Sequence, residues 1–370
     1  MTVIAAFNVQ SCPIVFGDLL ITAETEPVDR VVSVPALGDV RDFFEDSGWT
    51  VTGLAQKVVI ITQSCVVAWA GSWIAAKLVI SQLRDMASDE PLTADGILSF
   101  LQQHPDLQQH PIALMGWVRE DRGLKPFWYH AEDVFDGGKL GVVSAAGTGA
   151  HVLREFAVIA GQSPIAASGQ VGAGEMAVST ALLLAGILLR AELHGGDAAP
   201  TLRCMFGGGY EIASYLNGEF RKVGDLTFVV WEAQVADGGV KISFPQLLLK
   251  QQYLHDVLLL RSARIKENSG HLEVFDEQFH AILPMYEISK EILAEDLSNV
   301  SLQSLILCHC FFVRSGDAVS IYTRVQQCAP SSELTMTVED ASGKILLGFN
   351  NAFLQEIAKE LVKQEHNAKQ

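Results

Sequence analysis

The sequence has few basic residues. Lys and Arg together number 26, against 43 Asp and Glu, so the formal net charge of the 370 residues is −17. Proteins that bind nucleic acids by neutralising phosphates carry clusters of Lys and Arg, and this sequence contains no such cluster. We therefore expect no nucleic-acid partner.

A long apolar run is also missing. The longest one, Met176–Leu189, contains Ser179, Thr180 and Gly186 and is shorter than the ~20 residues that a transmembrane helix needs. The N-terminal stretch lacks the basic residues with which a secretory signal begins. We therefore expect no membrane partner and a cytoplasmic location.

Motifs for metals and cofactors are scarce as well. The six cysteines form no C-x-x-C pair. Cys308 and Cys310 flank His309, but this spacing is more typical of small apolar side chains in a core strand than of a metal site. The glycines between Gly169 and Gly174 have the wrong spacing for a dinucleotide-binding turn. The sequence thus predicts no metal and no cofactor.

Apolar residues are what the sequence has in abundance. Hydrophobic residues make up 49% and charged residues 19%, which excludes a disordered chain. The length allows one large domain or two ordinary ones. The pattern of the sequence changes near Gly238, so we expect an α/β unit over residues 1–237 and an extension or second domain over residues 238–370.

Periodicity predicts the main elements. Lys57–Ala70 has the pattern of a hairpin, and Ser72–Ala87 that of an amphipathic helix. Glu175–Leu193 is almost without a polar face, which indicates a buried helix. Two further helices are expected in the second unit, Leu247–Ser262 and Met285–Leu297. Strands that alternate with paired helices favour helices layered over antiparallel sheets.

The first candidate for chemistry is Thr2. It follows Met1 directly and opens the first expected strand. If Met1 is removed, the α-amine of Thr2 becomes free, and an amine with an ordinary pKa near ~7.7 can accept the proton of the neighbouring hydroxyl. The dipeptide Met-Thr alone is common, so other residues have to support this interpretation.

Four further motifs follow Thr2 along the chain, and their order and spacing are informative. A short apolar strand, Leu19–Glu24, ends in an acidic residue, and Lys57 begins a hairpin fourteen residues before Gly71. A Gly-Thr-Gly turn, Gly147–Gly149, precedes a helix, and the long apolar helix is followed by Gly207 and Gly208. In this order and spacing, about 220 residues resemble a proteasome β subunit, a member of the N-terminal nucleophile hydrolases.

The resemblance implies roles for individual residues. Thr2 would be the nucleophile, with its own amine as the base, and Lys57 would lower the pKa of that amine. Either Glu24 or Asp18 would orient Lys57, and the sequence leaves both open.

Two more residues would complete the site. By the same resemblance, Thr148 would hold the amine and the backbone N–H of Gly71 would stabilise the oxyanion. The sequence also departs from the pattern, because Arg203–Phe206 stands where the family carries a supporting aspartate and serine. The extension 238–370 has no counterpart in the family.

The resemblance also implies a fold and a function. The fold would be α+β, a four-layer αββα sandwich over residues 1–237 with a C-terminal α+β extension. The function would be a threonine hydrolase that cleaves peptide or amide bonds after removal of Met1. The other hypothesis is an inactive, proteasome-like subunit that acts as a scaffold or binding module. In either case the resemblance implies a homo-oligomer, because proteasome-like proteins form rings.

Overall fold

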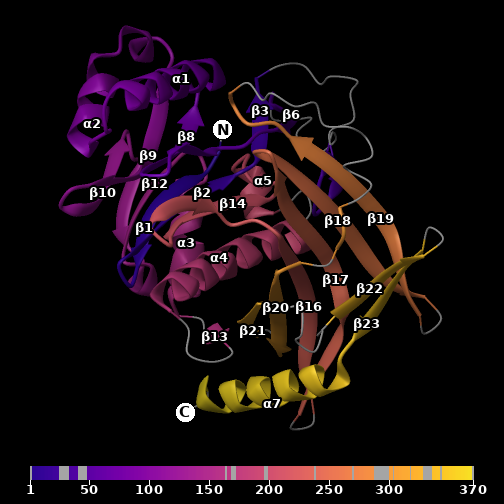
Figure 1. The fold of residues 1–370 in the computed structure, drawn as a ribbon. Coiled ribbons are helices and arrows are strands. Elements are labelled where there is room, and N and C mark those ends of the chain that lie inside the picture. Colours follow the sequence, from indigo (N-terminus) through magenta and orange to yellow (C-terminus); the bar gives the residue numbers. More distant parts are fainter. Residues whose placement is uncertain are drawn as a thin grey trace.

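The structure is a computed structural model. It describes residues 2–24, 33–40, 48–162, 165–167, 172–195, 199–236, 239–268, 271–286, 300–302, 304–316, 318–327, 336–341 and 344–368. Strand is more abundant than helix in these residues. Three large sheets follow one another from the upper left to the right of the view in Figure 1, with helices between the second and the third and on the outer faces.

The first strand belongs to a six-stranded antiparallel sheet. In spatial order its strands are β11 (Asp133–Asp136), β12 (Val142–Ala146), β1 (Ile4–Val9), β2 (Cys12–Asp18), β14 (Tyr210–Leu216) and β15 (Glu219–Lys222). The β1–β2 turn holds Gln10 and Ser11 at positive φ angles of 49° and 67°. This tight hairpin places the start of β1 beside the end of β2, where Ile4 pairs with Gly17.

A four-stranded antiparallel sheet packs against one face of the six-stranded sheet. Its order is β10 (Gly123–Tyr129), β9 (Ile112–Glu120), β8 (Cys65–Gly71) and β7 (Val58–Thr62). Alternate side chains of both sheets, such as Ile4, Val15, Val66 and Met115, form one buried apolar cluster. The predicted hairpin at Lys57–Ala70 is confirmed, because β7 and β8 are antiparallel neighbours.

Two helices cover the other face of the four-stranded sheet. They are α1 (Trp73–Asp89) and α2 (Ala94–Gln103), and both share an apolar cluster with that sheet. Side-chain caps define where they begin, because Ser72 accepts a hydrogen bond from the backbone N of Ala75 and Thr93 accepts one from that of Gly96. Two short 3₁₀ helices are η2 (Pro105–Gln108) and η3 (Gly138–Leu140).

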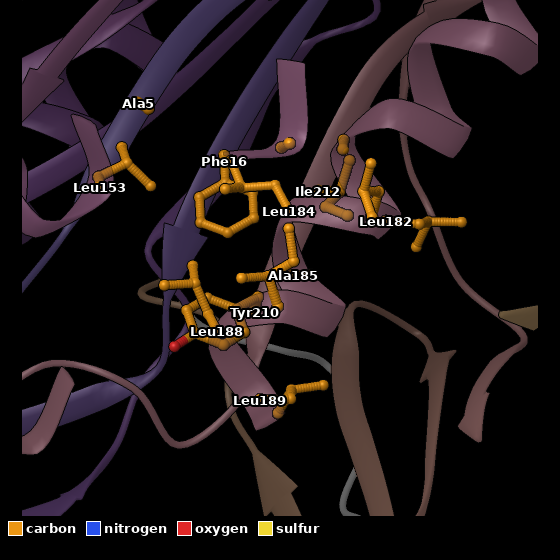
Figure 2. Close-up of a cluster of buried hydrophobic side chains, with 14 of the residues drawn as sticks. Ala5, Phe16, Leu153, Leu182, Leu184, Ala185, Leu188, Leu189, Tyr210 and Ile212 are labelled. Carbon is orange, nitrogen blue, oxygen red and sulfur yellow. The ribbon is translucent and has the colours of Figure 1, made fainter. Parts of the chain in front are cut away.

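Helices α3 (Ala150–Gln162) and α4 (Ala173–Gly195) lie on the far side of the six-stranded sheet. Figure 2 shows Leu184, Ala185 and Leu188 of α4 facing the side chains of this sheet. Helix α4 is long and apolar enough to cross a membrane, but 78% of its most apolar 18-residue window is buried inside the molecule. The short α5 (Pro200–Arg203) follows it.

A seven-stranded mixed sheet covers the opposite side of α4. Its order is β13 (Ile165–Ala167), β21 (Ala318–Gln327), β20 (Ile306–Ser315), β16 (Leu226–Ala236), β17 (Gly239–Leu254), β18 (Val257–Asn268) and β19 (His271–Ile282). One face shares the core of α4, and Cys308 and Cys310 are buried there as small core side chains. The C-terminal helix α7 (Asn351–Ala368) packs on the other face through Phe353, Ile357 and Leu361.

Three strand pairs complete the described structure. They are β3 (Leu20–Ala23) with β6 (Thr50–Leu54), β4 (Ser33–Val34) with β5 (Gly38–Asp39), and β22 (Met336–Ala341) with β23 (Lys344–Phe349).

The predicted fold class, a four-layer αββα sandwich with an α+β extension, is wrong. The chain is mainly β-sheet, and a third large sheet covers the α4 layer, where the sandwich would have met solvent (Figure 1). The apolar residues on all sides of α4 have a physical reason, since sheets contact it on both sides. The sequence indicated that this helix is buried but not which element covers it.

The helix predicted at Leu247–Ser262 is also wrong. This segment contains the second half of β17 and the first half of β18, and the chain turns between them at His255 and Asp256, whose φ angles are 47° and 68°. Leu residues that are buried on both faces of a sheet give no clear period of two, so they resemble a buried helix. The helix predicted at Met285–Leu297 falls mostly on residues 287–299, outside the described residues.

The expected division at residue 237 falls inside a β-hairpin. Strands β16 and β17 on either side of it are antiparallel neighbours, with Ala236 paired to Gly239. Strand β13, from the first unit, also joins the seven-stranded sheet, where it is parallel to β21. Residues from both expected units therefore form this sheet together.

Candidate active site around Thr2

Thr2 lies immediately before β1 and is buried, with 2% of its surface exposed. Its Oγ1 donates a hydrogen bond to Oδ1 of Asp18. The next backbone N–H, of Val3, donates to the same oxygen at 2.9 Å. The β1–β2 hairpin thus brings the predicted nucleophile into contact with Asp18, one of the two acids predicted to orient Lys57.

Asp18 is the last residue of β2, and its carboxylate is fully buried. While Oδ1 contacts Thr2, the other oxygen, Oδ2, accepts backbone N–H groups of Leu20 at 3.1 Å and Gly207 at 2.9 Å. A buried carboxylate is stable in its charged form when hydrogen-bond donors and a cation surround it. The donors here come from segments far apart in the sequence.

Lys57 supplies the cation. It precedes β7, its side chain is fully buried, and its Nζ lies 2.6 Å from Asp18 Oδ1 and 2.6 Å from the carbonyl oxygen of Leu20. Burial lowers the pKa of Lys57, and the carboxylates of Asp18 and Glu211 act in the opposite direction. Thr2, Asp18 and Lys57 therefore form one hydrogen-bonded cluster.

The two candidates for the orienting acid are now distinguished. Asp18 contacts both Thr2 and Lys57. Glu24 is exposed in the bend after β3. The acid that orients Lys57 in this structure is therefore Asp18.

The Gly-Thr-Gly turn holds Thr2 through its backbone. The N–H of Gly149 donates to the carbonyl oxygen of Thr2 at 3.2 Å. Gly147 has a φ of +92°, and a Cβ there would lie 2.2 Å from that same oxygen, so only glycine fits. Thr148 itself is exposed, and its Oγ1 donates to the carbonyl oxygen of Cys204 at 2.5 Å. The structure thus places Thr148 beside the site with its hydroxyl bonded to another segment.

Gly71 ends β8 and is exposed, with a φ of +98°. Its neighbour in the four-stranded sheet is Ile112. A Cβ at Gly71 would lie 2.5 Å from the carbonyl oxygen of Pro111, the residue just before β9, so only glycine fits this position.

Glu192 is a buried carboxyl that the sequence analysis did not select. It lies on α4; Tyr210 donates its hydroxyl to Oε1 at 2.5 Å, and the N–H of Gly208 faces Oε2 at 3.3 Å. A Cβ at Gly207 would lie 2.6 Å from Oε1, so the packing is close. Asp18 and Glu192 thus accept the N–H groups of two adjacent residues, Gly207 and Gly208. Burial raises the pKa of Glu192 to about 8.

Glu192 supplies a carboxyl group near the place where the aspartate and serine of the family are missing. The stretch before Gly207 has no Asp or Ser, and the carboxyl group next to this turn comes from helix α4 instead. A sequence signal did exist, because an acidic residue in an otherwise apolar helix needs a buried partner. Its partner could not be read from the sequence.

One more pair of reactive side chains lies nearby. Sγ of Cys204 is 3.6 Å from Nε2 of His151. Burial, together with the charge of Glu155, raises the pKa of the Cys204 thiol, which makes it a poor nucleophile. Among the residues that the structure describes, no group of three or more His, Cys, Asp or Glu is arranged to hold a metal ion.

No protein-family model matches the sequence, and no curated protein matches it.

Proposed function

We propose that the protein is a threonine hydrolase that cleaves peptide or amide bonds after the peptide bond preceding Thr2 has been cut. One observation carries the proposal: Thr2, Asp18 and Lys57 are joined by hydrogen bonds at the start of β1. Met1, whose removal would free the Thr2 amine, lies outside the described residues.

The freed α-amine of Thr2 acts as the general base in this proposal. It takes the hydroxyl proton while Oγ1 attacks the substrate carbonyl carbon, which forms a tetrahedral oxyanion. The ammonium then returns the proton to the leaving amine as the C–N bond breaks, and an ester to Thr2 remains. Water, deprotonated by the same amine, hydrolyses the ester and releases the acid. The N–H of Gly71 remains the proposed oxyanion donor.

Lys57 and Asp18 act on this base through charge. A lysine cation near the amine favours its neutral form and so lowers its pKa, which leaves more free base at neutral pH. Asp18 holds Nζ of Lys57 at 2.6 Å, and its carboxylate opposes the lowering of the Lys57 pKa that burial causes. The same carboxylate fixes Thr2 through its hydroxyl and the neighbouring N–H.

A non-catalytic scaffold is the second candidate, and a specific observation favours it. Thr2 is only 2% exposed, and its hydroxyl already donates to Asp18. A buried cluster of this kind also stabilises a fold without chemistry. If the protein is a scaffold, Thr2→Ala should affect stability and function only as much as another mild core substitution does.

Turnover measurements separate the two candidates. We would assay the full chain on a panel of fluorogenic peptide amides, together with Thr2→Ala, Thr2→Ser and Thr52→Ala. Thr52 is an exposed threonine of β6 that serves as the matched control. The hydrolase predicts no turnover for Thr2→Ala, reduced turnover for Thr2→Ser and unchanged turnover for Thr52→Ala. Equal rates in all four proteins would exclude Thr2 as the nucleophile.

We also propose that the protein is a homo-oligomer. An exposed apolar patch on α1 supports this, since Trp73, Ile74 and Leu78 are 45%, 72% and 39% exposed. Sedimentation at micromolar concentration should give a multiple of the 40.1 kDa chain mass, and a monomer would contradict the proposal.

A further inference from the structure

A buried polar network joins the residue before Lys57 to the seven-stranded sheet. Gln56 is 1% exposed, and its Nε2 donates to two carbonyl oxygens, of Asp256 at 2.7 Å and Ile282 at 2.6 Å. These carbonyls belong to the β17–β18 turn and the end of β19. Its Oε1 accepts a hydrogen bond from Nζ of Lys222 at 2.5 Å. The amide of Gln56 is thus fully paired, so its position is fixed by the sheet.

Glu211 holds the backbone of Lys57 itself. Its Oε2 accepts the N–H groups of Lys57 at 2.7 Å and of Val58 at 3.1 Å. Its Oε1 accepts Nζ of Lys222 at 2.7 Å and the hydroxyl of Tyr253 at 2.9 Å. Tyr253 is a residue of β17, so the seven-stranded sheet orients the carboxylate that in turn orients Lys57.

Apolar contacts reinforce the same connection on the Asp18 side. Leu19 packs in a buried cluster with Leu258, Leu260 and Ile282 of the seven-stranded sheet. This sheet therefore touches both segments that carry the buried ion pair, one next to Asp18 and one next to Lys57.

We propose that Gln56, Glu211 and Tyr253 are positioning residues that hold Lys57 against Asp18 and Thr2, so that the C-terminal half of the chain is part of the support of the active site. The inference rests on the proposed function for its catalytic meaning. Nζ of Lys57 lies 2.6 Å from Asp18, and a shift of its backbone lengthens this contact. The charge of the lysine then acts less strongly on the Thr2 amine, whose pKa rises.

Two conservative variants and one matched control test the inference in the full chain. Tyr253→Phe removes the hydroxyl that contacts Glu211, and Gln56→Met removes all three amide hydrogen bonds at nearly constant volume. Tyr322→Phe is the control, because it removes a tyrosine–glutamate hydrogen bond, to Glu360, in the same sheet but on the α7 side. Hydrogen exchange of the Lys57 and Val58 amides and the pH profile of kcat/KM are measured for each.

The inference predicts about tenfold faster exchange of these two amides in Tyr253→Phe and Gln56→Met. It also predicts that the acid limb of kcat/KM moves to higher pH in both, with KM unchanged, while Tyr322→Phe matches the parent protein. Faster exchange in a protein without any turnover would support the positioning of Lys57 and contradict only the hydrolase. Exchange and pH profiles that are alike in all three variants would overturn the inference.

Discussion

Lys57 is a cation that the fold removes from water completely. Its side chain and that of Asp18 are both 0% exposed, and Nζ finds two oxygens, one from Asp18 and one from Leu20. Burying two charges stabilises a protein little, but removing one partner leaves the other unpaired and is severe. This asymmetry lets the pair be tested by stability alone.

Lys57→Met should lower the free energy of unfolding by about 3–5 kcal/mol, because it leaves the Asp18 carboxylate buried without a cation. Lys125→Met is the matched control. Nζ of Lys125 also lies 2.6 Å from a carboxylate, that of Glu120, but 46% of its side chain is exposed. The control should leave stability close to that of the parent protein, because water screens an exposed ion pair. Urea unfolding of both variants checks this, and equal effects would contradict the buried pair.

Glu192 makes stability depend on pH. Burial raises its pKa from the ordinary 4.5 to about 8, so between these values the folded protein keeps a proton that the unfolded chain has lost. Its contribution to stability is therefore largest at acid pH and falls as pH rises towards 8. The nearby groups are the Tyr210 hydroxyl, which opposes the shift, and the charge of Asp18, which adds to it.

Glu192→Gln should remove this dependence. Its stability relative to the parent protein should rise by roughly 1.4 kcal/mol per pH unit between about pH 5 and pH 8. Urea unfolding at pH 5, 6, 7 and 8 measures the difference, and Glu24→Gln, an exposed carboxyl, serves as control. Parallel stability curves for the parent and Glu192→Gln would show that Glu192 is charged in the folded protein.

Among the elements, helix α4 lies between the six-stranded and the seven-stranded sheets. It contacts β2 and β14 of one sheet and β20 and β21 of another (Figure 1). The approach to β20 is close, since a Cβ at Gly186 would lie 2.3 Å from Sγ of Cys310. The small residue at position 186 is therefore a packing requirement of this interface.

Gly186→Ala should change stability in opposite directions, depending on whether this face of α4 is covered by β20 or exposed. On an exposed face, alanine would stabilise the helix by about 1 kcal/mol. Against β20 it should destabilise by about 1–3 kcal/mol, because Cys310 has to move within a packed core. Thermal unfolding of Gly186→Ala, and of Gly186→Ala with Cys310→Ala, measures this. The second substitution should recover part of the loss, and a more stable Gly186→Ala would contradict the packing.

The sequence predicted elements that depend on local patterns better than contacts between distant segments. The hairpin at Lys57–Ala70 was predictable because its pattern and turn are local. The candidate cluster was predictable in part, since the resemblance to the proteasome β subunit implied Lys57. Only the β1–β2 register showed that Asp18, and not Glu24, contacts it. Leu247–Ser262 was missed because strands buried on both faces have no clear period.

At the scale of the whole molecule, the two halves of the chain share a sheet. Strand β16 precedes residue 237, and its neighbours β17 and β20 follow it. No local pattern shows this, because parallel pairing such as β16 with β20 joins segments about 80 residues apart. The sequence therefore could not show how residues 238–370, expected as an extension or second domain, pair with the first unit.

Sharing a sheet predicts how the chain unfolds. A fragment of residues 1–237 would leave β16 without β17 and β20, and would expose the face of α4 that these strands cover. We expect this fragment to aggregate, and the full chain to unfold in one cooperative transition. Expression of the fragment and calorimetry of the full chain test this. A soluble, folded fragment with native-like near-UV circular dichroism would contradict it.

If Thr2, held by Asp18 and Lys57, is a nucleophile, an intact mass of the protein will show it. The purified protein is weighed before and after exposure to a β-lactone, which acylates an activated hydroxyl, and the adduct is located by peptide mapping. We predict loss of Met1 and one adduct on Thr2, which is absent in Thr2→Ala and forms more slowly in Lys57→Met. A protein that retains Met1 and gains no adduct would contradict the hydrolase and favour the scaffold.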